Sequence, residues 1–272
     1  MIKFVMIILL VLFALLVLYI LSTRCRCGHK GLTDLHGWNY THRGLHNNDA
    51  PENSLEAFRR AVDAGYGSEL DVHLLADGNL AVIHDSLLKR VCGKEGRIEE
   101  LTKYDLSNCF INGTVHTIPL FSEVLEVYNG KAPLIVEIKP YQNVDALCHK
   151  VAQLLDTYQG VFCVESFDPR CVYWFRKNRP DYIRGQLTEN YFNNKNSQLP
   201  AVLKVLLYAV VFNFMTLPDF VAYRFPERKH LSHYICRKLW HADSVSWTLE
   251  TKEQYDIAVA EDCIPIFEGF TP

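Results

Sequence analysis

The sequence predicts an α/β fold in which strands and helices alternate and close into a barrel, preceded by one membrane-spanning helix. Three observations lead to this prediction: an unbroken apolar run at residues 4–21, a strand-helix alternation that begins at Leu120, and a length of 272 residues. That length accommodates one barrel domain of roughly 250 residues. The predicted organisation is a transmembrane anchor at residues 1–23, a juxtamembrane linker at residues 24–37 and a barrel at residues 38–272.

The N-terminal run contains 18 apolar residues, which is long enough to cross the hydrocarbon core of a bilayer as a helix. A cleaved signal peptide is the alternative because Lys3 precedes the run, but no small-x-small cleavage site follows, and we therefore expect a retained anchor. Lys3 is the one charged residue before the run, whereas Arg24, Arg26 and Lys30 come after it. The positive-inside rule therefore predicts a single-pass membrane protein with its barrel on the cytoplasmic side.

Composition narrows the partners and the compartment. The net charge of −3 gives no indication of nucleic-acid binding, and we expect no nucleic-acid partner. Nine cysteines form no paired framework, and an odd number fits a reducing compartment better than a disulfide scaffold. Cys25 and Cys27 have the spacing of a metal or lipidation site, but we interpret them as ordinary thiols beside the membrane.

The barrel begins with residues 38–41, a short β-prone stretch that predicts the first strand and ends at His42. Asn53 and Glu56 have the spacing of a capping box, which predicts a helix beginning there. Gly65 is then expected to end this helix.

Residues 68–74 are typical of a buried strand, on which Glu69 and Asp71 project from the same face. Two adjacent carboxylates repel each other and lose hydration, and a cation between them relieves both costs. Oxygen ligands suit a hard divalent ion such as Mg²⁺ or Ca²⁺, whereas a zinc or iron site would recruit histidine or cysteine.

A turn at residues 77–78 and an apolar run at residues 80–83 lead to His84, which has Asp85 beside it. A histidine next to a carboxylate, near a metal site, is a candidate proton-transfer group. Residues 87–116 carry few regular signals and predict a loop-rich excursion beside this site.

From Leu120 onward the chain alternates regularly between helix-like and strand-like segments. The predicted helices are residues 121–128, 144–158 and 169–177, and the predicted strands are residues 133–138, 161–165, 183–187, 220–223, 244–247 and 264–267. Right-handed crossovers between such units close into a barrel with its functional groups at the C-terminal ends of the strands. We expect His42, His84, Glu137 and Lys139 at these ends.

Residues 199–218 form a second apolar stretch, which Lys204 and Asn213 interrupt. Its contiguous apolar part is too short to span a bilayer. Two interpretations remain open: a buried barrel helix with long loops, or an interfacial helix that dips into the bilayer beside the barrel mouth.

Several short motifs occur in a distinctive order along the chain. They are His42-Arg43-Gly44, Pro51-Glu52-Asn53-Ser54, Glu69-Leu70-Asp71-Val72, Asp77-Gly78, His84-Asp85, Ile118-Pro119-Leu120, Ile135-Val136-Glu137-Ile138-Lys139, Glu165-Ser166-Phe167-Asp168 and Trp247-Thr248. Together they resemble the signature of the glycerophosphodiester phosphodiesterase family over residues 38–272. The resemblance implies a (β/α)₈ TIM barrel and metal-assisted hydrolysis of a glycerol-linked phosphodiester.

The resemblance also implies roles for individual residues. Glu69, Asp71 and Glu137 would hold one divalent cation, Mg²⁺ or Ca²⁺. His42 and His84 would divide the proton transfers, one deprotonating the attacking oxygen and the other protonating the leaving alkoxide.

Four further residues are candidates for substrate contact. Arg43 and Lys139 would offset the charge of the phosphodiester, and Trp247 would line the pocket as an apolar wall. Glu52 either approaches the metal or orients Arg43. A structural alternative is that the carboxylates of the predicted metal site only form salt bridges with Arg43 and Lys139.

The sequence departs from the family pattern at Leu75, where threonine is common, and at residues 266–270, which replace a frequent Thr-Asp. We expect neither position to carry the core chemistry. These departures therefore bear on the choice of substrate and not on whether the protein is active.

We predict metal-dependent hydrolysis of glycerophosphodiesters to sn-glycerol 3-phosphate and an alcohol. The expected partners are a small-molecule or lysolipid phosphodiester and the lipid bilayer. One alternative is a lysophospholipase D that takes monoacyl lipids from the bilayer, which residues 199–218 favour. A third hypothesis, a catalytically silent barrel that binds phosphodiesters as a scaffold, conflicts with the presence of both histidines and all three carboxylates.

Overall fold

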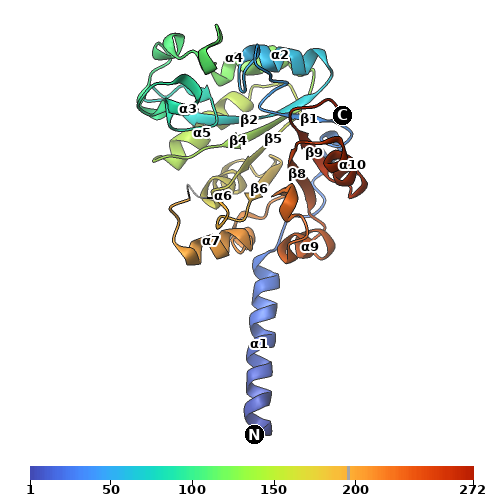
Figure 1. Cartoon of the computed structure of the whole chain (residues 1–272). Coiled ribbons are helices and arrows are strands. Elements are labelled where there is room, and N and C mark those ends of the chain that lie inside the picture. The colour runs from blue at the N-terminus through green and yellow to red at the C-terminus, as the bar shows by residue number, and fades with distance from the viewer. Residues whose placement is uncertain (195–196) are drawn as a thin grey trace.

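The computed structural model describes residues 1–194 and 197–272 (Figure 1). Within these residues, eight parallel strands form a barrel in the order β1-β9-β8-β7-β6-β5-β4-β2, and pairing between β1 and β2 closes it. The barrel strands are β1 (Tyr40–His42), β2 (Gly67–Leu74), β4 (Leu134–Ile138), β5 (Phe162–Ser166), β6 (Arg184–Thr188), β7 (Phe220–Arg224), β8 (Asp243–Leu249) and β9 (Ile264–Phe267). The predicted TIM barrel is confirmed, and each predicted strand falls within a few residues of an observed one.

One strand does not belong to the barrel. β3 (Leu80–Val82) pairs antiparallel with the second half of β2, with Leu80 opposite Leu74 and Val82 opposite Val72. The expectation that His84 follows a barrel strand is therefore wrong. β2 is long enough to extend past the barrel mouth. β3 then runs back antiparallel to β2, and His84, which follows β3, approaches the mouth from outside the barrel.

Helices cover the outside of the barrel. They are α2 (Leu55–Asp63), α4 (Phe121–Tyr128), α5 (Val144–Leu155), α6 (Pro169–Asn178), α9 (Leu231–Lys238) and α10 (Lys252–Ala260), with α7 (Ala201–Tyr208) and the short α8 (Asn213–Thr216) following β6. The excursion at residues 87–116 holds the short helix α3 (Leu88–Cys92) and three 3₁₀ turns, as its weak signals predicted.

The start of α2 differs from the prediction by one residue. Ser54, not Asn53, is the N-cap, and its hydroxyl accepts a hydrogen bond from the backbone N–H of Ala57. Asn53 has a positive φ of 57° and directs its side chain inward, where it donates to Asp71 at 2.9 Å. Because Ser54 caps the helix, the side chain of Asn53 remains available to bind Asp71.

The N-terminal half of the barrel interior is apolar. Leu32 and Leu35, from the juxtamembrane residues, pack there with Tyr40, Ile135 and Phe220. Because this end is filled with hydrocarbon, the polar interior residues are confined to the C-terminal end of the strands.

The predicted N-terminal helix is present as α1 (Ile2–Ser22), and it projects away from the barrel with no buried residue (Figure 1). Among the described helices, it is the one that is long and apolar enough to cross a membrane. Its C-terminal end is fixed to the domain: Trp240 donates to the carbonyl oxygen of Ile20 at 3.1 Å, and Arg26 forms a 2.5 Å ion pair with the buried Asp219.

Candidate active site

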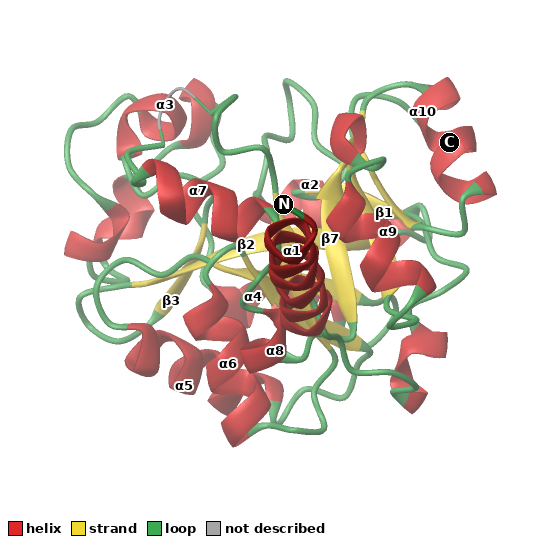
Figure 2. Cartoon of the chain, turned by 90° about the horizontal axis from the view of Figure 1, so that it is seen from below, coloured by secondary structure: helices red, strands yellow, loops and turns green. Residues whose placement is uncertain are grey.

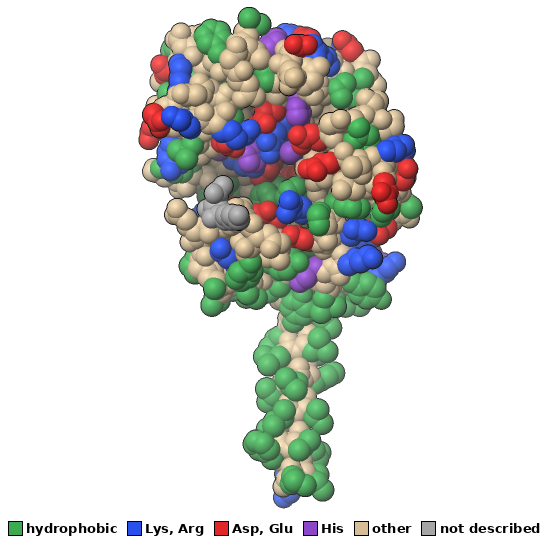
Figure 3. Space-filling view, viewed as in Figure 1, with side chains coloured by type: hydrophobic (Ala, Val, Ile, Leu, Met, Phe, Trp, Pro, Cys, Tyr) green, Lys and Arg blue, Asp and Glu red, His purple; other side chains and the backbone are tan. Residues whose placement is uncertain are grey.

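The C-terminal end of the barrel forms a hollow in which acidic, basic and histidine side chains gather (Figure 3). Neighbouring strands place them there. Asp71 on β2 lies opposite Glu137 on β4, Glu137 lies opposite Glu165 on β5, and His42 on β1 lies opposite Glu69 on β2.

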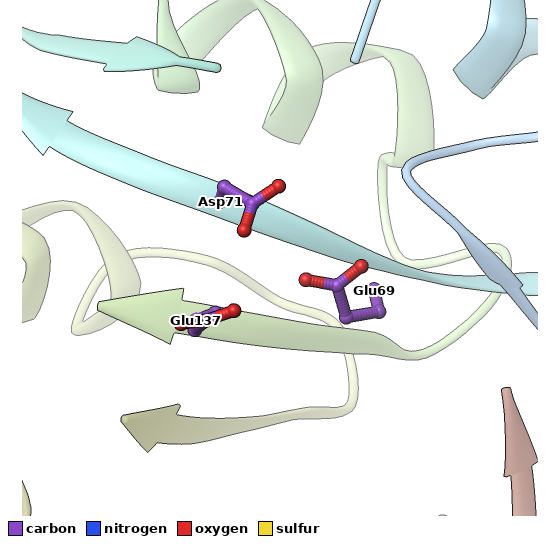
Figure 4. A group of neighbouring side chains, drawn as sticks. All are labelled: Glu69, Asp71 and Glu137. Atoms are coloured by element: carbon purple, nitrogen blue, oxygen red, sulfur yellow. The ribbon is translucent and has the colours of Figure 1, made fainter. Parts of the chain in front are cut away.

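Three carboxylates form the centre of the site. Oxygen atoms of Glu69, Asp71 and Glu137 all lie within 4.8 Å of one another, and the three side chains converge between β2 and β4 (Figure 4). All three residues are buried, with Asp71 fully withdrawn from solvent. This is the cluster that the sequence predicted as a metal site.

Three ionised carboxylates this close together in a buried position repel one another. Burial raises the pKa of Glu69 well above its usual range, and the charges of Asp71 and Glu137 raise it further. Burial also raises the pKa of Glu137, to about 7, against the opposing effect of Lys139. Burial would likewise raise the pKa of Asp71, but Lys139 and His84 hold it well below its usual range.

Two cations lie against this cluster. Lys139 places Nζ 3.1 Å from Asp71 Oδ1 and 2.8 Å from Glu137 Oε1, and Arg43 places Nε 3.4 Å from Asp71 Oδ2. The salt bridges proposed as a structural alternative are thus present, but they do not involve Glu69. Within the described residues, Glu69 has no ion pair with lysine or arginine, and it accepts a 3.3 Å bond from the backbone N–H of Arg43.

The donor set therefore fits a hard divalent cation. Glu69, Asp71 and Glu137 supply carboxylate oxygens of the type that Mg²⁺ and Ca²⁺ prefer, from a buried position where like charges are costly. Glu165, beside Glu137, adds a fourth buried carboxyl whose pKa burial raises well above the usual range. Sequence reasoning assigned Glu165 no role, although its place in a motif at a strand end was a usable signal.

His42 is held by a carboxylate that sequence analysis excluded. Its Nδ1 lies 2.5 Å from Glu268 Oε2, while its Nε2 faces Glu69 at 3.9 Å. Glu268 also lies 3.3 Å from His46, and its bonds to His42 and then His46 keep its pKa well below the usual range. Residues 266–270 were expected to lie outside the core chemistry, but closure of the barrel places Glu268, the residue after β9, in contact with the predicted catalytic His42.

His84 has a matching arrangement. Its Nδ1 lies 2.5 Å from Asp85 Oδ1, and Arg90 fixes Asp85 from the other side at 2.6 Å. Burial lowers the pKa of both His42 and His84 below the usual value for imidazole. Each imidazole thus has one nitrogen held by a carboxylate, which fixes its orientation and tautomer.

Glu52 lies between two guanidinium groups. It accepts from Arg43 at 3.2 Å and from Arg90 at 2.7 Å, an arrangement that corresponds to the expected orienting role. Arg90 comes from the irregular excursion, which contains no sequence pattern from which the position of this side chain could be predicted.

An open cavity of about 910 Å³ leads from these groups toward α7 and α8. His84, Glu137 and Lys139 line its polar end. Its apolar wall is formed by Phe167, Leu199, Leu203, Leu207, Phe212 and Met215. Trp247 packs edge-on against Phe167, with ring centroids 5.6 Å apart, and so supports this wall.

The family model described as "Glycerophosphoryl diester phosphodiesterase family" matches residues 42–227, which include the carboxylates, both histidines and Lys139. A glycerophosphodiester phosphodiesterase of Bacillus altitudinis is 32% identical over 60% of this chain and 71% of its own length. A human lysophospholipase D is 35% identical over 39% of this chain and 37% of its own length.

Solved structures share the fold. A phosphodiesterase of Oleispira antarctica, determined with its product sn-glycerol-3-phosphate, superposes with a TM-score of 0.68 at 18% identity over 89% of this chain and 95% of that one. A glycerophosphodiester phosphodiesterase of Thermotoga maritima gives a TM-score of 0.65 at 23% identity over 85% and 94%.

The fold, together with acidic and basic groups converging at the strand ends, defines a phosphoric diester hydrolase, and the predicted enzyme class is confirmed. More narrowly, the chain belongs to the glycerophosphoryl diester phosphodiesterase family. Among the described residues, the buried carboxylates Glu69, Asp71 and Glu137 at the barrel mouth form a cluster that could hold a metal ion.

Proposed function

We propose that this protein hydrolyses glycerophosphodiesters to sn-glycerol 3-phosphate and an alcohol, with one divalent cation held by Glu69, Asp71 and Glu137. The observation that carries the proposal is the convergence of these three buried carboxylates with two carboxylate-held imidazoles at one barrel mouth. When bound, Mg²⁺ or Ca²⁺ would neutralise phosphate charge and lower the pKa of the attacking oxygen.

His42 and His84 divide the proton transfers. Burial lowers the pKa of each imidazole, which favours the neutral form that the base requires, whereas the histidine that acts as the acid must enter the reaction with a proton on Nε2. Glu268 and Asp85 each engage Nδ1, which leaves Nε2 to exchange a proton with the substrate. One imidazole deprotonates the attacking oxygen, and the other protonates the departing alkoxide.

Arg43 and Lys139 bind the phosphodiester. Both now pair with carboxylates of the site, and a bound cation would take over part of that charge. Their donors would then be free to hold phosphate oxygens and to stabilise the charge that develops at phosphorus. Glu52 keeps the Arg43 guanidinium in place.

A lysophospholipase D activity is the second candidate, and the cavity favours it. A glycerophosphodiester such as glycerophosphocholine is polar throughout, whereas the wall formed by Leu203, Leu207 and Phe212 is hydrocarbon. A monoacyl lipid would place its phosphodiester beside His84 and its chain along that wall.

We also propose that α1 is retained as a membrane anchor. Residues 1–23 form this anchor, residues 38–272 form the barrel, and the barrel lies on the cytoplasmic side of the membrane. Removal of α1 by cleavage near residues 22–28 would threaten the ion pair between Arg26 and the buried Asp219. An unpaired buried carboxylate is costly, so the junction favours retention. The basic residues after the span favour the cytoplasmic orientation.

The test uses the full chain in nanodiscs, with turnover of glycerophosphocholine and lysophosphatidylcholine measured in Mg²⁺, in Ca²⁺ and in chelator. We expect chelator-sensitive release of glycerol phosphate. His42→Ala and His84→Ala should each lose on the order of 10²- to 10⁴-fold in kcat, while the exposed His149→Ala on α5 should match the unsubstituted chain. Preference for the lysolipid would favour the second candidate. Equal turnover in all variants would refute the histidine assignment, and no turnover with any metal would favour a binding scaffold.

A further inference from the structure

Seven of the eight residues of helix α7 are apolar, Lys204 being the exception, yet none of its residues is buried. A helix of this kind is normally enclosed in a protein core or in a membrane. The interpretation of this segment as a buried barrel helix therefore fails for α7. Leu203 and Leu207, four residues apart, line the cavity, whereas Val202 and Val205 lie on another side and are 72% and 52% exposed.

The same exposure of hydrocarbon continues on α8 and α9. Seven large apolar side chains on or next to the three helices retain between 40% and 72% of their accessible surface. We call this set the docking surface: Val202 and Val205 on α7, Phe214 and Met215 on α8, and Leu231, Tyr234 and Leu239 on or next to α9. A patch of this kind marks a contact site for an apolar partner.

The three helices surround the point where α1 leaves the domain. Viewed along α1, the helices α7, α8 and α9 lie around it (Figure 2), and hydrophobic side chains cover the underside next to it (Figure 3). The ring of Tyr208 on α7 packs at a tilt of 34° against that of His230, directly before α9, with ring centroids 4.1 Å apart. Trp240, directly after α9, bonds to Ile20 in the last turn of α1. The docking surface is thus continuous with the base of the apolar span.

Exposed cationic side chains accompany this surface. Arg24 follows the last turn of α1, Lys229 precedes α9, and Lys238 is the last residue of α9. Apolar side chains with cations beside them match the boundary between acyl chains and anionic headgroups.

We propose that the docking surface lies in the headgroup region of the bilayer that α1 spans, and that the bilayer is its partner. The proposal requires α1 to be retained, since the end of a spanning helix fixes the depth of whatever packs against it. α7 then separates the bilayer from the catalytic cavity, with Val202 and Val205 toward lipid and Leu203 and Leu207 toward the cavity. A monoacyl lipid could pass between the two over the edge of α7; that consequence also rests on the proposed function.

The experiment measures the depth of introduced tryptophans in the full chain. The variants Val205→Trp and Leu231→Trp report on the docking surface, and Leu9→Trp reports on the span. Val115→Trp is the matched control, because Val115 is an 84% exposed valine in the excursion around α3, at the end of the domain away from α1 (Figure 1). Each chain is reconstituted in vesicles of phosphatidylcholine and phosphatidylglycerol, with bromine placed either high or deep on the acyl chains. The signal of the four native tryptophans is subtracted with the unsubstituted chain.

We expect tryptophans at 205 and 231 to be blue-shifted and quenched most by shallow bromine, tryptophan at 9 to be quenched by deep bromine, and tryptophan at 115 to be unquenched. Quenching at 9 without quenching at 205 and 231 would overturn the docking proposal while leaving the anchor. Absence of quenching at all positions would overturn both. A blue shift at 205 without quenching, in a chain that cross-links to itself, would assign the surface to a second copy and overturn the proposal. None of these outcomes depends on hydrolysis, so failure of the proposed function is measured separately.

Discussion

The barrel mouth and the underside around α1 depart from the usual distribution of residues in opposite directions. The mouth buries charge, since Glu69, Asp71 and Glu137 lie together with little exposure. The underside exposes hydrocarbon, as at Val202 and Val205. Both arrangements are unfavourable for a polypeptide in water alone. We infer that each region is completed by a different partner, a divalent cation with a phosphodiester at the mouth and a bilayer at the underside.

The largest expected effect is a loss of activity without a loss of stability when a carboxylate at the barrel mouth is replaced. Glu69→Gln should lower kcat/KM on the order of 10³-fold, because the variant loses a proposed metal ligand. Its stability in chelator should stay within about 1 kcal/mol of the unsubstituted chain, since burial and like charges already disfavour the ionised carboxylate.

Thermal unfolding provides the measurement. The unsubstituted chain should gain stability when Mg²⁺ or Ca²⁺ is added, and Glu69→Gln should not. The exposed Glu250→Gln serves as the control. A large loss of stability in chelator, with activity retained, would mean that Glu69 is a structural residue and would remove the contrast between the two regions.

The second prediction concerns Glu268, the carboxylate on His42. Glu268→Gln should lower kcat by about 10- to 100-fold, because the His42 ring loses the partner that fixes its tautomer. The hydrogen bond that His42 donates to Glu268 raises the pKa of His42 against the effect of burial, so its loss should lower that pKa further. The limb of the pH-rate profile that belongs to His42 should therefore move to lower pH, with partial recovery in Glu268→Asp. An unchanged profile would show that Glu268 does not act on His42.

Glu268 also shows where prediction from sequence ends. The strand pattern was sufficient to place Glu69 and Asp71 on one face, because they are two residues apart on β2. Glu268 and His42 are 226 residues apart and meet only when β9 pairs with β1. Barrel closure was predicted, but the register that determines which side chain after β9 faces His42 depends on packing of the whole barrel.

The predictions of local structure were wrong or incomplete for a related reason. Asn53 and Ser54 are both good helix caps, and the sequence alone does not decide between them. The choice follows from tertiary structure, because Asn53 is drawn to Asp71 on another element. Arg90 was missed since the excursion that holds it has no periodicity. For segment 199–218 the sequence left a buried barrel helix and an interfacial helix both open, because which of its sides meets solvent depends on the position of the cavity.

The third prediction tests the helix that carries part of the docking surface. His233, on the inner side of α9, is held neutral between the carbonyl oxygen of Arg228 and the hydroxyl of Ser244. Burial lowers its pKa to about 4 from an ordinary value near 6.5. The unfolded chain therefore binds the proton first, and stability present above pH 6.5 should fall as the pH drops toward 4, on the order of 2 to 3 kcal/mol.

Denaturant unfolding at a series of pH values measures this slope. His233→Gln should be less stable at pH 7 and should lose that part of the slope, while His149→Gln on the exposed side of α5 should keep it. A His233→Gln chain with the full slope would place the pH sensitivity elsewhere.

The smallest expected effect links the two regions. Val205→Asp adds a charge to the outer side of α7 without altering the cavity wall, which Leu203 and Leu207 form. If α7 lies at the bilayer surface, the variant should turn over vesicle-borne lysophosphatidylcholine about fivefold more slowly, because withdrawing one partly inserted valine costs about 1 kcal/mol. Turnover of water-soluble glycerophosphocholine by the same full-length chain should be unchanged, since that substrate reaches the mouth from solution. Equal slowing of both substrates would indicate damage to the site, and no slowing of either would mean that the underside contributes only attachment. The ratio of lysophosphatidylcholine turnover to glycerophosphocholine turnover is therefore compared between Val205→Asp and the control Val115→Asp. This comparison measures how much the exposed apolar underside contributes to the supply of lipid substrate to the barrel mouth.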